Sequence, residues 1–232
     1  MSGGGSGIGL ACARALKAAG AHVTIMGRRE AVLWEAIHRG DAHEVLVGNA
    51  AQPPGIPRVN ILVNGAGAAS SAAFLKTSDV DFRAALEANL MSAVALTRAA
   101  LPAMLALGAG RIVNIASTAA LKGYPYVVPY VAAKHALLGF TRALALEVAG
   151  KGITVNAICP GFTETPLLAE SLTRIMEKTG LKAEATRAEL ARHNPQGRLL
   201  QPEEIAALAV FLCGDAAQGI NGAALPVSGG EV

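Results

Sequence analysis

The feature that most constrains the fold is a regular alternation of short apolar segments with longer segments of helical periodicity. β-Type runs cover residues 22–27, 43–49, 60–67, 110–117, 153–161 and 222–230, and helical patterns cover residues 29–39, 77–107, 128–152 and 201–214. The β runs are apolar on both faces, which is typical of parallel strands buried between two layers of helices. The sequence therefore predicts an α/β fold with a doubly wound, mostly parallel sheet and helices on both faces.

The composition is that of a globular protein rather than of a disordered or nucleic-acid-binding chain. The chain has 232 residues, 52% of them apolar and 16% charged, which indicates one globular domain over residues 1–232 rather than a disordered chain. The net charge of +3 is scattered without a run of five like charges, so we expect no nucleic-acid partner. We find no apolar run of about 18–20 residues and no signal peptide, and we expect a cytoplasmic protein without a membrane partner.

Neither the cysteines nor the histidines indicate a metal site. Cys12, Cys159 and Cys213 lie in apolar surroundings and have neither metal-ligand spacing nor an even count. We expect them to be buried free thiols in a reducing compartment.

Two places lack an element that the alternation of strands and helices requires: one lacks a helix and the other lacks a strand. Residues 48–60 contain Pro53, Pro54 and Pro57, which exclude much helix between two strands, so we expect a tight coil there. The glycine-rich segment "SGGGSGIG" at residues 2–9 has the composition of a loop that cradles a phosphate, but such loops follow a buried strand. Only Met1 and Ser2 precede its first glycine, so the first strand is missing from this sequence or the fold has rearranged.

Further motifs, taken together with this loop, give a specific resemblance. They are "NILVNGAG" at 60–67, "GRIVNIAST" ending in Ser117 and Thr118, "YVAAK" with Tyr130 and Lys134, and "NAICPGFTET" at 156–165. This set, in this order and over essentially the whole chain, resembles the short-chain dehydrogenase/reductase family. The resemblance implies a Rossmann-like fold, a nicotinamide cofactor and oxidoreduction of a carbonyl/alcohol pair.

The resemblance also implies the catalytic residues Asn89, Ser117, Tyr130 and Lys134. Tyr130 and Lys134 are four residues apart on one helix and share a face. An ammonium beside a phenol lowers the phenol pKa, so Tyr130 would exchange a proton with the substrate oxygen. Ser117 would hydrogen-bond that oxygen, and Asn89 would hold a water that links Lys134 to solvent.

Cofactor-binding residues are implied in five segments. They are Gly3, Ser6, Gly7, Ile8 and Gly9 in the loop; Arg28 and Arg29; Asn49 and Ala50; Asn64, Gly65, Ala66 and Gly67; and Pro160, Gly161, Thr163 and Thr165, joined by Tyr130 and Lys134. Gly65 departs from the family's usual "NNAG", which puts the bracing of the middle strands in doubt. Asn49 stands where the family often has an Asp.

In the family, the residue at the end of the second strand bears on the choice between NAD and NADP. In this sequence that strand corresponds to residues 22–27. Gly27 stands where an acid would accept from the ribose hydroxyls of NAD, and Arg28 and Arg29 follow it. An Arg accommodates the 2′-phosphate of NADP, so NADP(H) is favoured over NAD(H). Ser6 stands where many NADP enzymes of the family carry a second basic residue.

Residues 166–197 form a helical insertion for which two interpretations stay open. Leu167, Leu168, Leu172, Ile175, Met176 and Leu181 make an apolar face, which suits either a substrate lid or an ordinary helix pair packed on the core. "NPQGRL" at 194–199 resembles the segment that closes this region in acyl-thioester enzymes of the family. We therefore expect a 3-oxoacyl or 3-hydroxyacyl thioester as substrate, and a homotetramer, with a dimer next. The alternative is a cofactor-binding, non-catalytic subunit.

Overall fold

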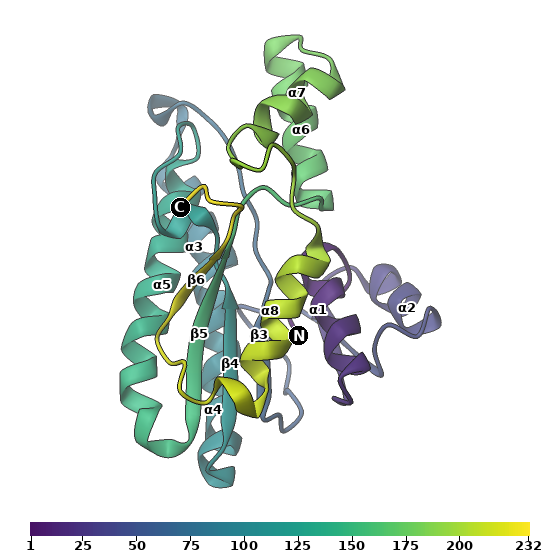
Figure 1. Cartoon of the computed structure of the whole chain (residues 1–232), viewed down its shortest axis with the longest axis vertical. Helices are drawn as coiled ribbons and strands as arrows, with labels where there is room; N and C mark the ends of the chain where they lie inside the picture. The colour runs from purple at the N-terminus through teal and green to yellow at the C-terminus, as the bar shows by residue number, and fades with distance from the viewer.

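The protein is an α/β structure in which a parallel sheet lies between two layers of helices (Figure 1). This computed structural model describes the backbone of residues 1–232 and the side chains of all of them except 178 and 179. The strands are β1 (Thr24–Gly27), β2 (Glu44–Val47), β3 (Ile61–Asn64), β4 (Gly110–Ile115), β5 (Ile153–Pro160) and β6 (Ala224–Val227). The helices are α1 (Gly7–Ala18), α2 (Glu30–His38), α3 (Asp79–Leu86), α4 (Ser92–Leu107), α5 (Val128–Val148), α6 (Pro166–Thr179), α7 (Ala183–Ala191) and α8 (Pro202–Cys213). The predicted fold class is confirmed.

The strand pairing divides the sheet into two pieces. β3, β4, β5 and β6 form a four-stranded parallel piece in that order, and β1 and β2 form a separate parallel pair. Ser2 bridges the two pieces, because it pairs in parallel with Met26 on β1 and with Asn64 on β3. The space between β1 and β3 is therefore where a further parallel strand would pair, and Met1 and Ser2 occupy one end of it.

The rest of that place is a cavity of about 510 Å³ between β1 and β3. Its lining includes Met1, Met26 and Leu62, together with residues 56–60 of the proline-rich coil. As predicted, residues 48–60 contain no helix. The α-ammonium of Met1 donates to the Thr24 carbonyl at 2.8 Å, and burial lowers its pKa to about 6. A terminal amino group is thus buried where a central strand would supply peptide groups, and its burial disfavours the charged form.

Each face of the sheet has its own apolar core. α1 and α8 pack against each other on one face, where Cys12, Ile25 and Ile205 are fully buried. α4 and α5 cover the other face, where Met104 and Ile112 are fully buried. Cys12 and Cys159 are buried free thiols, and Cys213 is partly buried.

The predicted helix at 77–107 forms, with a local change of pitch. Residues Glu87–Met91 adopt a π-helical turn between α3 and α4, and Asn89 is buried within it. Such turns are often found at functional sites, because they reorient one side chain. Contrary to our sequence reading, the continuous stretch Asp79–Leu107 is long and apolar enough to cross a membrane by length and composition alone. Here α4 packs on β3 and β4, and Leu96, Ala100 and Met104 are buried.

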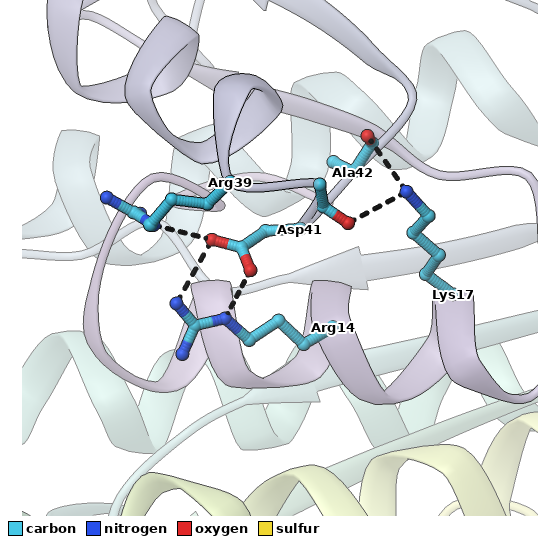
Figure 2. A network of polar contacts seen from close by, with 6 residues as sticks. Arg14, Lys17, Arg39, Asp41 and Ala42 are labelled. Carbon is cyan, nitrogen blue, oxygen red and sulfur yellow. Dashed lines mark hydrogen bonds and ion pairs between the residues drawn. The ribbon is translucent and has the colours of Figure 1, made fainter.

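The β1–β2 piece is tied to α1 through the turn that follows α2 (Figure 2). The Asp41 carboxylate accepts two hydrogen bonds from the Arg14 guanidinium, at 2.6 and 3.0 Å, and one from Arg39 at 2.9 Å. Lys17 donates to the Gly40 carbonyl at 2.8 Å. The Arg14 guanidinium holds the pKa of Asp41 below its usual range. These contacts fasten β2, which pairs with β1 alone among the strands described.

Candidate active site

The predicted catalytic side chains converge at the carboxyl end of β4. Ser117 lies just beyond that strand, and Tyr130 and Lys134 lie on the first turns of α5. The Lys134 ammonium donates to the carbonyl of Ile115 at 2.9 Å and lies 5.6 Å from the centroid of the Tyr130 ring. The fold therefore brings Ser117, Tyr130 and Lys134 together.

Asn89 joins this group from the π-helical turn before α4, which packs against α5. Its side-chain amide donates to the carbonyls of Ala68 and Ala85 at 2.8 and 2.9 Å. Its Oδ1 is buried without a hydrogen-bond partner among the described residues. A Cβ built on Gly67 would lie 2.7 Å from that Oδ1 and 3.7 Å from Lys134 Nζ, so both atoms face one small space. An orphaned acceptor beside an ammonium suits a bridging water.

Burial dominates the titration of this group. It raises the pKa of Tyr130, and a hydrogen bond with Ser117 acts in the opposite direction. Burial also lowers the pKa of Lys134 to about 8. The expectation that Lys134 lowers the pKa of Tyr130 is therefore not met in this structure. The Lys134 ammonium lies beside the Tyr130 ring, and its hydrogen bond goes to the Ile115 carbonyl rather than to the phenol oxygen.

The glycine loop has the tight geometry that a phosphate cradle requires. Gly3 and Gly7 have φ of +67° and +52°. A Cβ on Gly9 would lie 2.1 Å from the Gly3 carbonyl oxygen, so no side chain fits there. The loop ends at the N-terminus of α1, where Ser6 is the cap residue, so backbone N–H groups and the helix dipole face the same point. Ile8 lies in the first turn of that helix.

The residues predicted to hold a 2′-phosphate lie at the end of β1. The Arg29 guanidinium donates to the Ser6 hydroxyl at 3.3 Å, and both Arg28 and Arg29 are exposed. A Cβ on Gly27 would meet only Leu33, at an ordinary distance of 3.5 Å. A hydroxyl and two guanidinium groups therefore stand at the end of β1, where the sequence places no acid.

Asn49 and Ala50 lie beside this site, since Gly48 donates to the Gly27 carbonyl at 2.9 Å. The Asn49 side-chain carbonyl accepts from the Ala51 N–H at 3.1 Å, which leaves one lone pair for an adenine amino group.

The turn after β3 is held by Ser2, a residue that our sequence analysis did not single out. The Ser2 hydroxyl accepts from the N–H groups of Gly65 and Ala66 at 3.1 and 3.2 Å. A Cβ on Gly65 would lie 2.6 Å from the Met1 side chain, so the space of the usual side chain is filled by Met1. Asn64 is braced instead by Asn114, to which it donates at 2.8 Å. The only sequence signal for Ser2 was its place before the glycine loop.

The segment after β5 lies against the glycine loop. Pro160 ends β5, and Gly161 donates to the Val227 carbonyl at 2.9 Å. Thr163 folds its hydroxyl back onto the Gly161 carbonyl at 2.9 Å. A Cβ on Gly7 would lie 3.1 Å from the Thr165 methyl, so these two predicted cofactor segments are in contact.

The insertion at 166–197 forms a helical hairpin of α6 and α7 that projects from the body of the protein (Figure 1). It has a small core of its own, with Leu168, Leu172, Leu190 and Leu199 buried. Of the predicted apolar face, Leu167 and Leu181 are 36% and 45% exposed, whereas Leu168 and Leu172 are buried. Arg174 donates to the carbonyl of Ala69 at 3.1 Å, which ties the hairpin to the loop after β3. No cluster of metal ligands occurs among the residues described.

Comparison with known proteins agrees with this geometry. The sequence profile of the family described as "Enoyl-(Acyl carrier protein) reductase" matches residues 3–231. D-beta-hydroxybutyrate dehydrogenase of Cupriavidus necator is 38% identical over 248 aligned positions, covering 100% of this chain and 96% of the relative. The chain belongs to the short-chain dehydrogenase/reductase family.

Other members of the short-chain dehydrogenase/reductase family extend the comparison. Granaticin polyketide synthase putative ketoacyl reductase 1 of Streptomyces violaceoruber is 37% identical, covering 99% of this chain and 91% of the relative. A crystal structure of an actinorhodin polyketide ketoreductase variant with NADPH superimposes with a TM-score of 0.92 at 34% identity, covering 100% of this chain and 95% of that one. L-sorbose reductase of Gluconobacter frateurii, in complex with NADPH and L-sorbose, also gives 0.92, at 31% identity, with 100% and 94% covered. The protein is an oxidoreductase of a carbonyl/alcohol pair.

Proposed function

We propose that this enzyme uses NADP(H) to interconvert a ketone and a secondary alcohol, and that its substrate is a 3-oxoacyl or 3-hydroxyacyl thioester. The observation that carries the chemistry is the convergence of Ser117, Tyr130 and Lys134 beside the orphaned Asn89 acceptor. Similarity to putative ketoacyl reductases supports the thioester. A non-catalytic role is not favoured, because all four catalytic side chains are present and brought together.

The residues fit a bound nicotinamide dinucleotide. The loop of Gly3, Gly7 and Gly9 leaves a backbone cradle at a helix N-terminus, and Thr163 and Thr165 border it. When bound, the nicotinamide would supply or accept the hydride at the carbonyl carbon. Lys134 would hold the nicotinamide ribose, and Pro160 and Gly161 would border the carboxamide.

Side chains of the protein would transfer the proton to and from the substrate oxygen. Tyr130 would give its hydroxyl proton to the substrate oxygen during reduction and take it back during oxidation. Ser117 would donate to the same oxygen and stabilise the charge that develops on it. Because Lys134 and the free Asn89 oxygen face one space, a water held there would carry replacement protons to Tyr130 from solvent.

The cofactor preference rests on the end of β1. Arg29 and Ser6 are in contact and Arg28 adjoins them, so a 2′-phosphate would meet two cations and a hydroxyl. Solved relatives crystallised with NADPH or NADP support this choice.

The decisive experiment follows NADPH absorbance in purified protein with acetoacetyl-CoA, a set of simple ketones and a ketose. We expect turnover of the thioester with kcat/KM well above that of the ketose. Preference for the ketose would replace the thioester with a sugar or polyol substrate, while the absence of turnover with every carbonyl would overturn the proposed function.

We also propose a homotetramer, with a dimer as the alternative assembly. Leu105, Leu107 and Leu146, on α4 and α5, are 44%, 63% and 83% exposed, and closed symmetry is the usual way to cover such a surface. Light scattering at micromolar concentration tests this, and a monomer would contradict it. A cytoplasmic location stays a prediction, which cell fractionation can test.

A further inference from the structure

A buried carboxylate near the end of the chain, Glu231, lies against the loop that follows Ser117 and has no part in the chemistry proposed above. The Glu231 side chain is only 2% exposed. Its Oε1 accepts from the Tyr124 hydroxyl and lies 3.0 Å from Lys122 Nζ and 3.8 Å from His193 Nδ1. Its Oε2 is buried and has no hydrogen-bond partner among the residues described.

These contacts join segments that are far apart in the sequence. Lys122 and Tyr124 lie in the loop that continues from Ser117, and His193 follows α7 at the base of the hairpin. A Cβ on Gly161 would lie 3.0 Å from Glu231 Oε2, so the carboxylate also packs against the segment after β5. One side chain therefore touches the catalytic loop, the proposed nicotinamide segment and the base of the hairpin.

Aromatic rings surround the carboxylate on the same side. Tyr124, Phe162 and His193 have ring centroids 5.1–6.0 Å apart in all three pairs. The Tyr124 hydroxyl is also 2.6 Å from the Thr118 hydroxyl, and Thr118 follows Ser117. Both sides of this hydroxyl are thus occupied, and the orientation of the ring is fixed by Glu231 and Thr118.

The tail that carries Glu231 is itself held against the hairpin base. A Cβ on Gly229 would overlap the Asn194 side chain, 1.8 Å from its Oδ1, and Gly229 has a φ of +63°. Asn194 in turn donates to the Arg198 carbonyl at 2.9 Å and accepts from the Gln196 N–H at 2.8 Å. Movement of the hairpin base would therefore displace the tail and the carboxylate with it.

We propose that Glu231 is a positioning residue that couples the α6–α7 hairpin to the aromatic wall of Tyr124, Phe162 and His193, and so sets the affinity for the carbonyl substrate. This inference rests on the proposed function. Because Glu231 contacts neither Tyr130 nor Lys134 among the residues described, its loss acts on substrate binding rather than on the proton transfer.

The test compares Glu231→Ala, Glu231→Gln, Tyr124→Phe and the double variant of Tyr124→Phe with Glu231→Ala. Glu231→Ala should raise the KM for acetoacetyl-CoA by about tenfold, the effect of losing a hydrogen bond to a charged group, with a smaller change in kcat and an unchanged KM for NADPH. Glu231→Gln keeps an acceptor for Tyr124 and should restore part of the affinity. The double variant should be little worse than Glu231→Ala, because both changes break one contact.

A second readout needs no turnover. Limited trypsin digestion should cleave Glu231→Ala faster than wild type within the hairpin, where Lys182 and Arg187 are exposed. Glu189→Gln is the matched control, since it removes an exposed ion pair with Arg192 on the same hairpin and should leave KM and cleavage unchanged.

Additive effects of the two single changes on KM, or an unchanged KM in Glu231→Ala, would overturn the proposal. If wild type turns over no carbonyl, the proposed function fails. The digestion then decides the role of Glu231 alone, and equal cleavage of wild type and Glu231→Ala would overturn it.

Discussion

The two pieces of the sheet differ in the extent of their strand pairing and burial, and both contribute residues to the candidate active site. β4 and β5 pair over six residues in the buried middle of the β3–β6 piece, with β4 and β5 entirely buried. β1 and β2 pair over four residues, and the β2 pattern is exposed or half-buried throughout. Among the residues described, Ser2 forms β-bridges to both pieces.

This difference separates chemistry from cofactor choice. The β3–β6 piece carries Ser117 at the end of β4 and supports α5 with Tyr130 and Lys134, so proton transfer rests on the well-packed side. The β1–β2 piece carries Arg28 and Arg29 and rests on α1, Ser2 and the Asp41 contacts (Figure 2). We infer that changes on the first side alter the rate, whereas changes on the second alter stability and cofactor selectivity.

The largest effect is expected from Tyr130→Phe on the β3–β6 side. It removes one oxygen, so folding and cofactor binding should persist while kcat falls by about 10²–10⁴-fold, the contribution of a general acid. Tyr126→Phe is the control, since Tyr126 is 65% exposed and takes no part in the proposed chemistry. NADPH turnover and fluorescence titration measure both properties. Retained activity in Tyr130→Phe would move the chemistry away from this side.

Lys134→Ala should reduce both cofactor affinity and kcat, because in the proposed mechanism its ammonium would hold the ribose and take part in the proton route. Thermal stability should not fall by as much as for a core residue, since burial already lowers the Lys134 pKa to about 8 and makes the charged form costly. Loss of turnover with unchanged NADPH affinity would restrict Lys134 to the proton route.

The next largest effect is expected from filling the cavity between β1 and β3. An N-terminal extension of about six Val- and Ile-rich residues, a usual strand length, should enter the cavity and pair with β1 and β3. Each new hydrogen bond contributes about 0.5–1.5 kcal/mol, and removal of the buried α-ammonium adds to this. We expect Tm to rise by about 10 °C and NADPH to bind more tightly.

The matched control for that extension is a Gly/Ser segment of the same length, which lacks β propensity and apolar side chains. Equal Tm for the two extended proteins, measured by calorimetry, would mean that the two pieces of the sheet do not need a strand between them. A high Tm and tight NADPH binding in the 232-residue chain would give the same answer.

A smaller effect is expected from Gly27→Asp at the end of β1. The new carboxylate would repel a 2′-phosphate and accept from ribose hydroxyls, so the ratio of kcat/KM for NADPH to that for NADH should fall by about tenfold or more. The absence of backbone strain at Gly27 and the ordinary distance to Leu33 leave room for the side chain. An unchanged ratio would show that Arg28 and Arg29 do not adjoin the adenosine ribose.

The smallest effect is expected from Asp41→Asn, which weakens the fastening of the β1–β2 piece. Arg14 is nearly half exposed, so the loss should be about 1 kcal/mol in the free energy of unfolding. Since the folded-state pKa of Asp41 is lowered, its stabilisation is present above the unfolded pKa of about 3.9 and is lost as pH falls through the lower folded value. Urea unfolding at pH 7 and pH 3 measures this, and an equal loss at both would contradict it.

The sequence by itself determined most of the elements, and its resemblance to a family indicated which residues carry the proposed chemistry. Apolar periodicity, the glycine loop and the Ser117, Tyr130 and Lys134 spacing are local patterns, and local patterns constrain local backbone and one face of a helix. The unfilled place between β1 and β3 was also indicated, because the glycine loop is not preceded by the strand that such loops follow. The coil at 48–60 could also be predicted from the sequence, because proline disfavours a helix through its fixed φ and missing N–H.

Only the tertiary structure decided what depends on neighbours from distant segments. The π-helical turn at Asn89, the raised pKa of Tyr130 and the exposure of Leu167 follow from packing that no local pattern encodes. Ser2 and Glu231 lie at the two ends of the chain, and each acquires its role from partners more than 20 residues away. Hydrogen bonds and burial over such separations depend on the closed fold, which is why sequence reasoning missed both residues.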